Sequence, residues 1–280
     1  LIIIYAKILR KNNYGSISVL PLSYKFFYFN YVYNNLYIKS VKYLCKLLIL
    51  LQNIYSLNNV LLYLSIEPEP NCIISNTFDF INFFKNWLIS KCKLYFLVKN
   101  FNKFIFDYIK ICLDICHSSV EFESVKQNIN MFYLFNLKIG KLQISSSLKF
   151  DKKYFNDICV FFFLPETPYI HQLYGATFYN DIIIYKDISL FNIFICNKNT
   201  IEYRVHYHIP IFLEYYDFFK STRYFINNVF QFLLYKKLCS IFEVETYTFD
   251  ILPCYLKFNV LYSLICEYEW FLKEYENFFN

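Results

Sequence analysis

The sequence predicts an α+β fold whose most regular part lies between residues 91 and 186. Short stretches of β-favouring residues, such as 93–99 and 181–185, alternate here with stretches of helical periodicity. Hydrophobic residues make up 57% of the chain, enough to bury a sizeable core. Pro68 and Pro70 are too close together to lie inside a helix, so they mark a break before this region.

The elements between residues 93 and 185 follow the order β-α-β-β-α-β. A strand over 93–99 leads into a helix from Asn102 to about Cys116, whose apolar residues recur at helical spacing. The extended stretches 139–147 and 158–164 form the middle pair of strands. A helix over 169–178 and a strand over 181–185 complete the order, which is that of a ferredoxin-like split β-α-β core. Many functions use this arrangement, so it does not identify one.

The parts before and after this core are predicted to be long extensions. Residues 1–90 form a partly helical N-terminal extension, with a helix-like stretch over 41–66 and an amphipathic helix over 77–90. Residues 187–280 form an acidic C-terminal extension. The predicted organisation is therefore 1–90, 91–186 and 187–280.

Charge is divided unevenly along the chain. Residues 1–90 carry 8 basic and 3 acidic residues, residues 91–153 carry 11 and 5, and residues 154–280 carry 9 and 14. A positive field over the first half suits a polyanion, and nucleic acid is the commonest one. An excess of lysine codons would explain the abundant lysine as well, but not the acidic last part.

The amino-acid usage indicates a reduced organellar genome. Residues with A/T-rich codons dominate, with 34 Phe and 29 Tyr, whereas the chain has only 3 Gly. Because the same bias inflates apolar residues everywhere, hydropathy overstates membrane character. The best candidate span, 47–66, has no charge but holds five polar side chains near its centre that lipid would leave unsatisfied. We therefore expect no membrane insertion.

The residue patterns indicate no catalytic chemistry. Three glycines are too few for a phosphate-binding loop. Cys112, Cys116 and His117 lie close together, but no second Cys/His pair completes a zinc site. His206 and His208 would share one face of a strand, with no third ligand nearby in the sequence. We therefore expect a protein that is not an enzyme, with no catalytic residues, no cofactor and no metal.

Residues 93–185 resemble a known family, small-subunit ribosomal protein ten, the universal protein of the ribosomal head. Residues 99–107, KNFNKFIFD, are similar to the family's K-(S/A)-F-D-H-x-L-(I/L)-D segment. Residues 138–147, KIGKLQISSS, resemble K-I-K-K-F-T-V-L-R-S, and 151–153 stand where the family has N-K-K. The family's G-P-x-P-L-P-T segment is absent, and Phe161–Phe163 replace its basic strand.

The resemblance implies a structural constituent of the mitochondrial small ribosomal subunit, in the matrix. Such a protein binds ribosomal RNA and neighbouring small-subunit proteins and acts on no small-molecule substrate. Ammonium groups suit phosphate because they displace condensed counterions. For each lysine the alternative is a solvated surface position. The residues that the resemblance implies for RNA binding are Lys138, Lys141, Lys152 and Lys153, with Lys99 and Lys149 as weaker candidates.

A second hypothesis is an organelle-encoded accessory subunit of a membrane respiratory-chain complex. In that case residues 47–66 would lie in or on the membrane. The sequence alone leaves this alternative open.

Overall fold

The computed structural model describes most of the chain, and its residues form two compact units. Unit 1 comprises Leu1–Leu113, Asn130–Leu142 and Leu238–Ile241, and unit 2 comprises Asp114–Ile129, Gln143–Lys237 and Phe242–Asn280. These limits differ from the three consecutive ranges expected from the sequence. The residues that the structure describes are 2–19, 22–27, 33–94, 101–154, 171–185, 187, 199–216, 219–233, 238–245 and 259–279.

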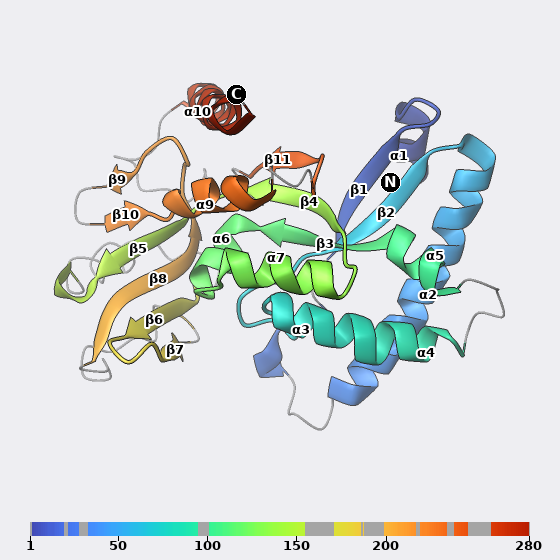
Figure 1. The fold of residues 1–280 in the computed structure, drawn as a ribbon, viewed down its shortest axis with the longest axis horizontal. Helices are drawn as coiled ribbons and strands as arrows, with labels where there is room; N and C mark the ends of the chain where they lie inside the picture. Colours follow the sequence, from blue (N-terminus) through green and yellow to red (C-terminus); the bar gives the residue numbers. More distant parts are fainter. Residues whose placement is uncertain are drawn as a thin grey trace. The chain divides into compact units, whose positions relative to one another are not determined.

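A curled, largely parallel sheet begins with strands of unit 1, and its last strand, β11, belongs to unit 2 (Figure 1). Strand β1 (Tyr14–Val19) pairs in parallel with β2 (Leu61–Ile66), which pairs in parallel with β3 (Ile109–Asp114). The order continues through β4 (Ile139–Ile144) to β11 (Phe242–Val244). Strands β2 and β4 are almost entirely buried. Burial on both faces explains the near-continuous apolar run of β2, whereas β4 also buries Lys141 and Gln143.

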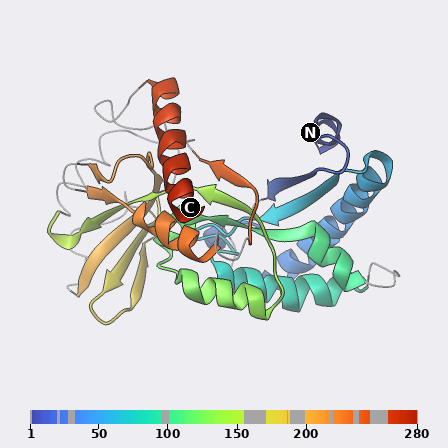
Figure 2. The same cartoon turned by 45° about the horizontal axis from the view of Figure 1, so that its top comes forward.

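Helices cover this sheet within unit 1. The long helix α2 (Tyr33–Asn58) lies beside β2 (Figure 2) and also contacts the short α1 (Ile2–Ile8). Helix α2 buries one stripe of side chains at helical spacing, which is the pattern of an amphipathic helix. The helices α3 (Thr77–Asn82) and α4 (Ser90–Cys92) are joined by a π-helical stretch, Phe83–Ile89, and α5 (Phe101–Tyr108) precedes β3.

Unit 2 contains an antiparallel sheet of order β7-β6-β8-β5-β10-β9. The long strand β8 is at its centre and pairs with β5 on one side and β6 on the other. A bulge interrupts the β5–β8 register between Ser147 and Leu148. The strands are β5 (Ser147–Asp151), β6 (Leu173–Thr177), β7 (Ile182–Tyr185), β8 (Thr200–His208), β9 (Tyr215–Tyr216) and β10 (Phe219–Ser221).

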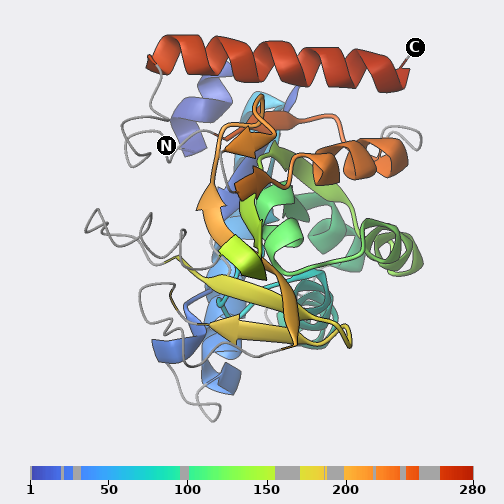
Figure 3. The ribbon, with the colours of Figure 1, turned by 90° about the vertical axis from the view of Figure 1, so that its left-hand side faces the viewer.

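The helices of unit 2 include α6 (Ile115–Val120), α9 (Tyr224–Leu233) and the single uninterrupted helix α10 (Val260–Phe279) (Figure 3). Phe230 of α9 packs its ring against Phe271 of α10 at a centroid distance of 6.0 Å. Helix α7 (Val125–Leu134) begins in unit 2 and ends in unit 1.

The structure is a mixed α/β protein with one parallel and one antiparallel sheet, which agrees with the predicted α+β class. The ferredoxin-like core is not confirmed. The helix predicted from Asn102 to Cys116 is wrong after Tyr108, because residues 109–114 form β3. The helix predicted over 169–178 is also wrong in its described part, where residues 173–177 form β6. Pairing with distant strands outweighed the local helical spacing in both places.

Other predicted elements are confirmed. The helix over 77–90 is present, and the stretch 41–66 is helical as far as Asn58 before it turns into β2. Strands are present at Ile139–Ile144 and Ile182–Tyr185. Most of the predicted strand 93–99 and all of the predicted strand 158–164 lie outside the described residues.

A buried carboxyl group on α10 makes the stability of unit 2 depend on pH. Glu267 is 2% exposed and accepts the backbone N–H of Ile211 at 3.1 Å, and burial raises its pKa to about 7. Because the pKa of Glu267 in the folded protein lies above its ordinary value, the contribution of this group to folding stability is fully present below pH 4.5. That contribution is lost as the pH rises through about 7.

We expect Glu267→Gln to remove this dependence while keeping an acceptor for Ile211. Between pH 5 and pH 8, the wild type should lose about 2–3 kcal/mol of unfolding free energy relative to this variant. Urea denaturation at several pH values measures the difference. Glu269→Gln, an exposed position on the same helix, is the matched control. An equal pH dependence for wild type and Glu267→Gln would contradict the assignment.

Candidate metal centre

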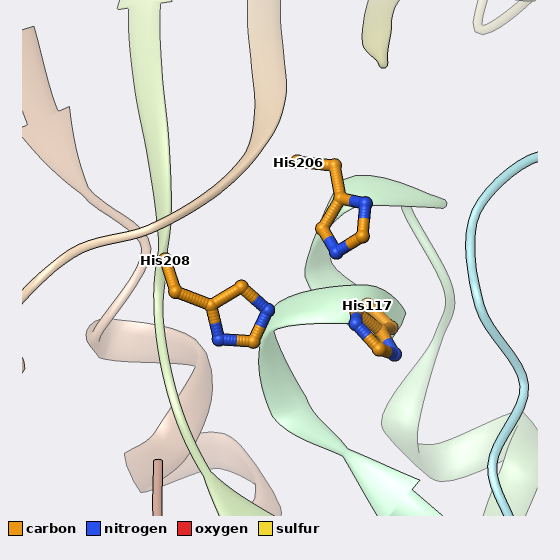
Figure 4. Close-up of side chains that lie close together, drawn as sticks. All are labelled: His117, His206 and His208. Carbon is orange, nitrogen blue, oxygen red and sulfur yellow. The ribbon is translucent and has the colours of Figure 1, made fainter. Parts of the chain in front are cut away.

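Three histidine side chains lie together in unit 2 (Figure 4). His117 belongs to α6, and His206 and His208 belong to β8. One ring nitrogen from each lies within 4.8 Å of one ring nitrogen of the others. Around a tetrahedral zinc ion, nitrogen ligands at about 2.05 Å from the metal would be about 3.4 Å apart. Small side-chain rotations would therefore bring the three rings onto one ion.

Local structure explains how these histidines meet. His206 and His208 are two residues apart on β8, so both side chains point to the same face of the sheet. His117 is in the first turn of α6, directly after β3. Asp114 caps this helix, since its carboxylate accepts the backbone N–H of His117 at 2.7 Å. The cap fixes the turn that presents His117.

Polar residues at the ends of three strands surround the histidines. Asp114 is the last residue of β3, Ser145 follows β4, and Glu245 follows β11. The Ser145 hydroxyl lies 3.0 Å and 3.1 Å from the two carboxylate oxygens of Asp114 and accepts the backbone N–H of Cys116 at 2.9 Å. Ligand sites in α/β proteins commonly lie beyond the carboxyl ends of strands, and these residues occupy such a place.

Each histidine has an oxygen near its Nδ1 atom, within hydrogen-bond distance only at His206. His206 Nδ1 is hydrogen-bonded to Gln172 Oε1 at 2.7 Å. His208 Nδ1 is 3.6 Å from a carboxylate oxygen of Glu245, and His117 Nδ1 is 3.9 Å from one of Asp114. Metal-binding histidines almost always present one nitrogen to such an oxygen, which orients the ring and leaves the other nitrogen toward the metal. In all three rings that other nitrogen is Nε2.

The ionisation of the cluster suits a cation. Burial lowers the pKa of His206 well below its ordinary value, and the neighbouring histidines lower it further. Burial also lowers the pKa of His208, to about 4, against an opposing effect of Asp114. Burial alone would raise the pKa of Asp114. Interactions with His117 and His208 and a hydrogen bond with Glu245 outweigh it, so the net direction is down. The neutral rings of His206 and His208 beside the Asp114 carboxylate suit a divalent metal.

His206 gives the most specific sign of a missing ligand. Its side chain is 7% exposed, and within the described part of the chain its Nε2 atom has no hydrogen-bond partner. An unsatisfied buried ring nitrogen costs free energy comparable to a lost hydrogen bond. Because Nδ1 is bonded to Gln172, a metal ion is well placed to satisfy Nε2.

A second ligand set is available in the same region but fits less well. Asp114, Cys116 and His208 also place one ligand atom each within 4.8 Å of the others. Cysteine binds a metal strongly only when it is ionised to the thiolate. Burial, with the charges of Asp114 and Glu245, raises the pKa of the Cys116 thiol well above its ordinary value. Cys116 is therefore the weakest of the candidate ligands.

The lysines predicted to bind RNA are not brought into one group. Lys138 pairs with Asp107 at 3.3 Å, and Lys141 is buried on β4, both in unit 1. Lys149 of unit 2 is 3.7 Å from Glu202, and its ammonium lies over the ring of Tyr224. The remaining three are Lys152 and Lys153, which follow β5 in unit 2, and Lys99, which lies outside the described residues.

The sequence near His206 and His208 offers no third ligand, and the fold supplies one from far away in the chain, His117. The order of residues did contain a signal. His117 follows an apolar strand and a capping aspartate, so it lies at the carboxyl end of a strand. That signal was hidden because residues 109–116 were assigned to a helix.

Among the described residues, no helix is both long enough and apolar enough to cross a membrane. Comparison with protein families, curated proteins and solved structures finds no match to this chain.

Proposed function

We propose that this chain binds one divalent transition-metal ion, with zinc the best suited, through His117, His206 and His208. The observation that carries the proposal is the buried Nε2 atom of His206, beside two further histidines. Imidazole nitrogen suits zinc, copper, iron and nickel, and zinc accepts the tetrahedral arrangement that three converging rings provide.

The composition of the site favours a reactive metal over a purely structural one. Structural zinc sites usually have four protein ligands, whereas three histidines leave one coordination position for water or substrate. A metal held this way would supply Lewis acidity and lower the pKa of a bound water molecule. Within the chain, Asp114 and Glu245 would balance the charge of the ion, and Gln172 would hold the His206 ring in place.

The expectation that the protein is not an enzyme stays a prediction. Two carboxyl groups of the proposed metal site are relevant to it. Asp114 is 2% exposed and ionised, and it is linked by a hydrogen bond to the carboxyl group of Glu245. Two carboxyl groups beside a metal provide groups able to accept or hold a proton. We therefore include metal-dependent catalysis in the proposal, without assigning a substrate.

Titration of the metal-free full chain with Co²⁺ tests the proposal. We expect saturation at one ion per chain, with the intense visible absorption of tetrahedral cobalt, and displacement of cobalt by Zn²⁺. Cys116→Ser should leave the affinity within about threefold, because the neutral thiol contributes no strong bond. Absence of saturable binding would refute the proposal. A large loss of affinity in Cys116→Ser would assign the metal to the second ligand set instead.

Ribosomal RNA binding remains a separate proposal, with the mitochondrial ribosome as its location. It is supported by the positive charge of residues 91–153 and by the sequence resemblance. The ferredoxin-like core belongs to the same proposal. Three of the six lysines lie in or directly after β5, where Lys153 is exposed. Binding of the full chain to a single-stranded RNA tests this proposal, and absence of binding would contradict it.

A further inference from the structure

Helix α2 of unit 1 has an exposed face that combines positive charge with apolar side chains. Lys39, Lys42 and Lys46 are all exposed, and their spacing of three and four residues places them along one stripe. The flanks of this stripe are also exposed and apolar. At 3.6 residues per turn, Ile38 and Ile49 lie on one side, and Tyr43 and Leu50 lie on the other.

The neighbouring helix α1 extends the same character. It contacts α2 and exposes Ile3, Ile4 and Ile8, each more than half accessible to solvent. Lys7, within α1, is exposed as well, as are Arg10 and Lys11 immediately after it. The exposed residues of α2, together with those of α1 and of the segment that follows it, are called the basic–apolar face.

The part of the sequence that forms this surface carries basic residues without acidic ones. Residues 1–66 contain seven basic residues and not one Asp or Glu, the first acidic residue being Glu67. An excess of lysine codons explains the basic residues but not why they are exposed together with isoleucines. A single exposed hydrophobic residue needs no explanation, whereas a group of them beside cations indicates a binding surface.

We propose that the basic–apolar face binds the surface of a membrane that contains anionic lipids. Lysine and arginine would lie at the lipid phosphates, and the flanking Ile, Leu and Tyr side chains would enter the boundary between headgroups and acyl chains. This binding is peripheral and needs no spanning helix. RNA is the weaker alternative, because phosphate contacts leave the exposed isoleucines without a role.

Co-sedimentation of the full chain with lipid vesicles tests the proposal. We expect binding to phosphatidylcholine vesicles that contain about 30 mol% phosphatidylglycerol, and little binding to phosphatidylcholine alone. Each basic residue near an anionic surface contributes about fivefold in affinity. Lys39→Gln/Lys42→Gln/Lys46→Gln should therefore weaken binding about 100-fold, and raised salt should weaken binding of the wild type.

Two further variants make the test specific. Lys126→Gln/Lys220→Gln/Lys273→Gln removes the same number of exposed charges outside the basic–apolar face and should bind like the wild type. Ile49→Gln/Leu50→Gln keeps every charge and should weaken vesicle binding, while leaving binding to a single-stranded RNA unchanged. Circular dichroism confirms that each variant is folded.

Three outcomes would overturn the proposal. The first is equal binding to neutral and anionic vesicles, and the second is equal weakening by the two lysine triples. The third is binding to RNA but not to vesicles, which would support the nucleic-acid alternative instead. Because the basic–apolar face is in unit 1 and the histidines are in unit 2, failure here leaves the metal proposal untouched.

Discussion

His206→Ala is expected to lower the affinity of the chain for Zn²⁺ by more than about 100-fold. Loss of a residue that merely orients a ligand already costs about 10–100-fold, and here the ligand itself is removed. The remaining two histidines cannot hold the ion in its tetrahedral arrangement without a replacement donor. Gln172→Leu removes only the oxygen that faces His206 Nδ1, so its cost should fall within the smaller range.

Competition titration against a chelator measures these affinities, and thermal unfolding with and without zinc checks them independently. At a free zinc concentration of 100 Kd, the wild type should gain about 2.7 kcal/mol of stability, and His206→Ala should gain almost nothing. His171→Ala is the control, because His171 is similarly buried and packs on Tyr207, and it is hydrogen-bonded to the backbone of His206 and not to its ring. Equal losses in His171→Ala and His206→Ala would indicate general damage to unit 2 and contradict the ligand assignment.

Gly140→Ala is expected to destabilise unit 1 by about 2–3 kcal/mol, because a methyl group on β4 has no room. It would collide with Ser65 Oγ, lie 2.8 Å from the Tyr63 ring and lie 2.9 Å from Lys110 Cβ. These neighbours are held in place. Tyr63 donates a hydrogen bond to the Gly140 carbonyl at 2.8 Å, and Ser65 is hydrogen-bonded to Ser16 at 2.7 Å. Gly140 does not have a positive φ, so the cost is steric and not conformational.

Urea denaturation of Gly140→Ala is best compared with the same change in the other unit. At Gly175 on β6, the nearest atoms to an added methyl group are 3.0 Å away, in Thr200 and Tyr203, so small shifts relieve the contact. The cost there should be about 1 kcal/mol or less, since the stiffer unfolded chain partly offsets it. If the Gly140→Ala variant were as stable as the Gly175→Ala variant, the side chains of β2 would not lie as close to Gly140 as these distances indicate.

The sequence predicted local features of the fold better than its pairings. The helix at 77–90 and the strand at 139–144 were predicted because their residue order has the local pattern of a helix and of an extended stretch. Residues 109–114 were assigned to a helix, since Ile109, Cys112 and Leu113 also satisfy helical spacing. Parallel pairing with β2, whose residues lie far away in the sequence, decided otherwise.

In the candidate site, too, the sequence predicts local features but not which distant residues come together. Alternation along a strand was enough to put His206 and His208 on one face. The spacing of residues did not indicate Asp114, His117 and Glu245 as their neighbours, because the first two lie at the end of β3 and the third follows β11, both far from β8 in the sequence. Metal ligands meet through the order of strands in a sheet, and that order is a property of non-local contacts.

The sequence by itself determined the composition, the partition of charge and the mixed α/β character of this protein. Those properties depend on residue type and on short-range periodicity, both of which follow directly from the order of residues. Only the tertiary structure decided which histidines gather and which lysines are used in internal contacts. The physical reason is that each of these outcomes depends on packing between segments that are far apart in the sequence.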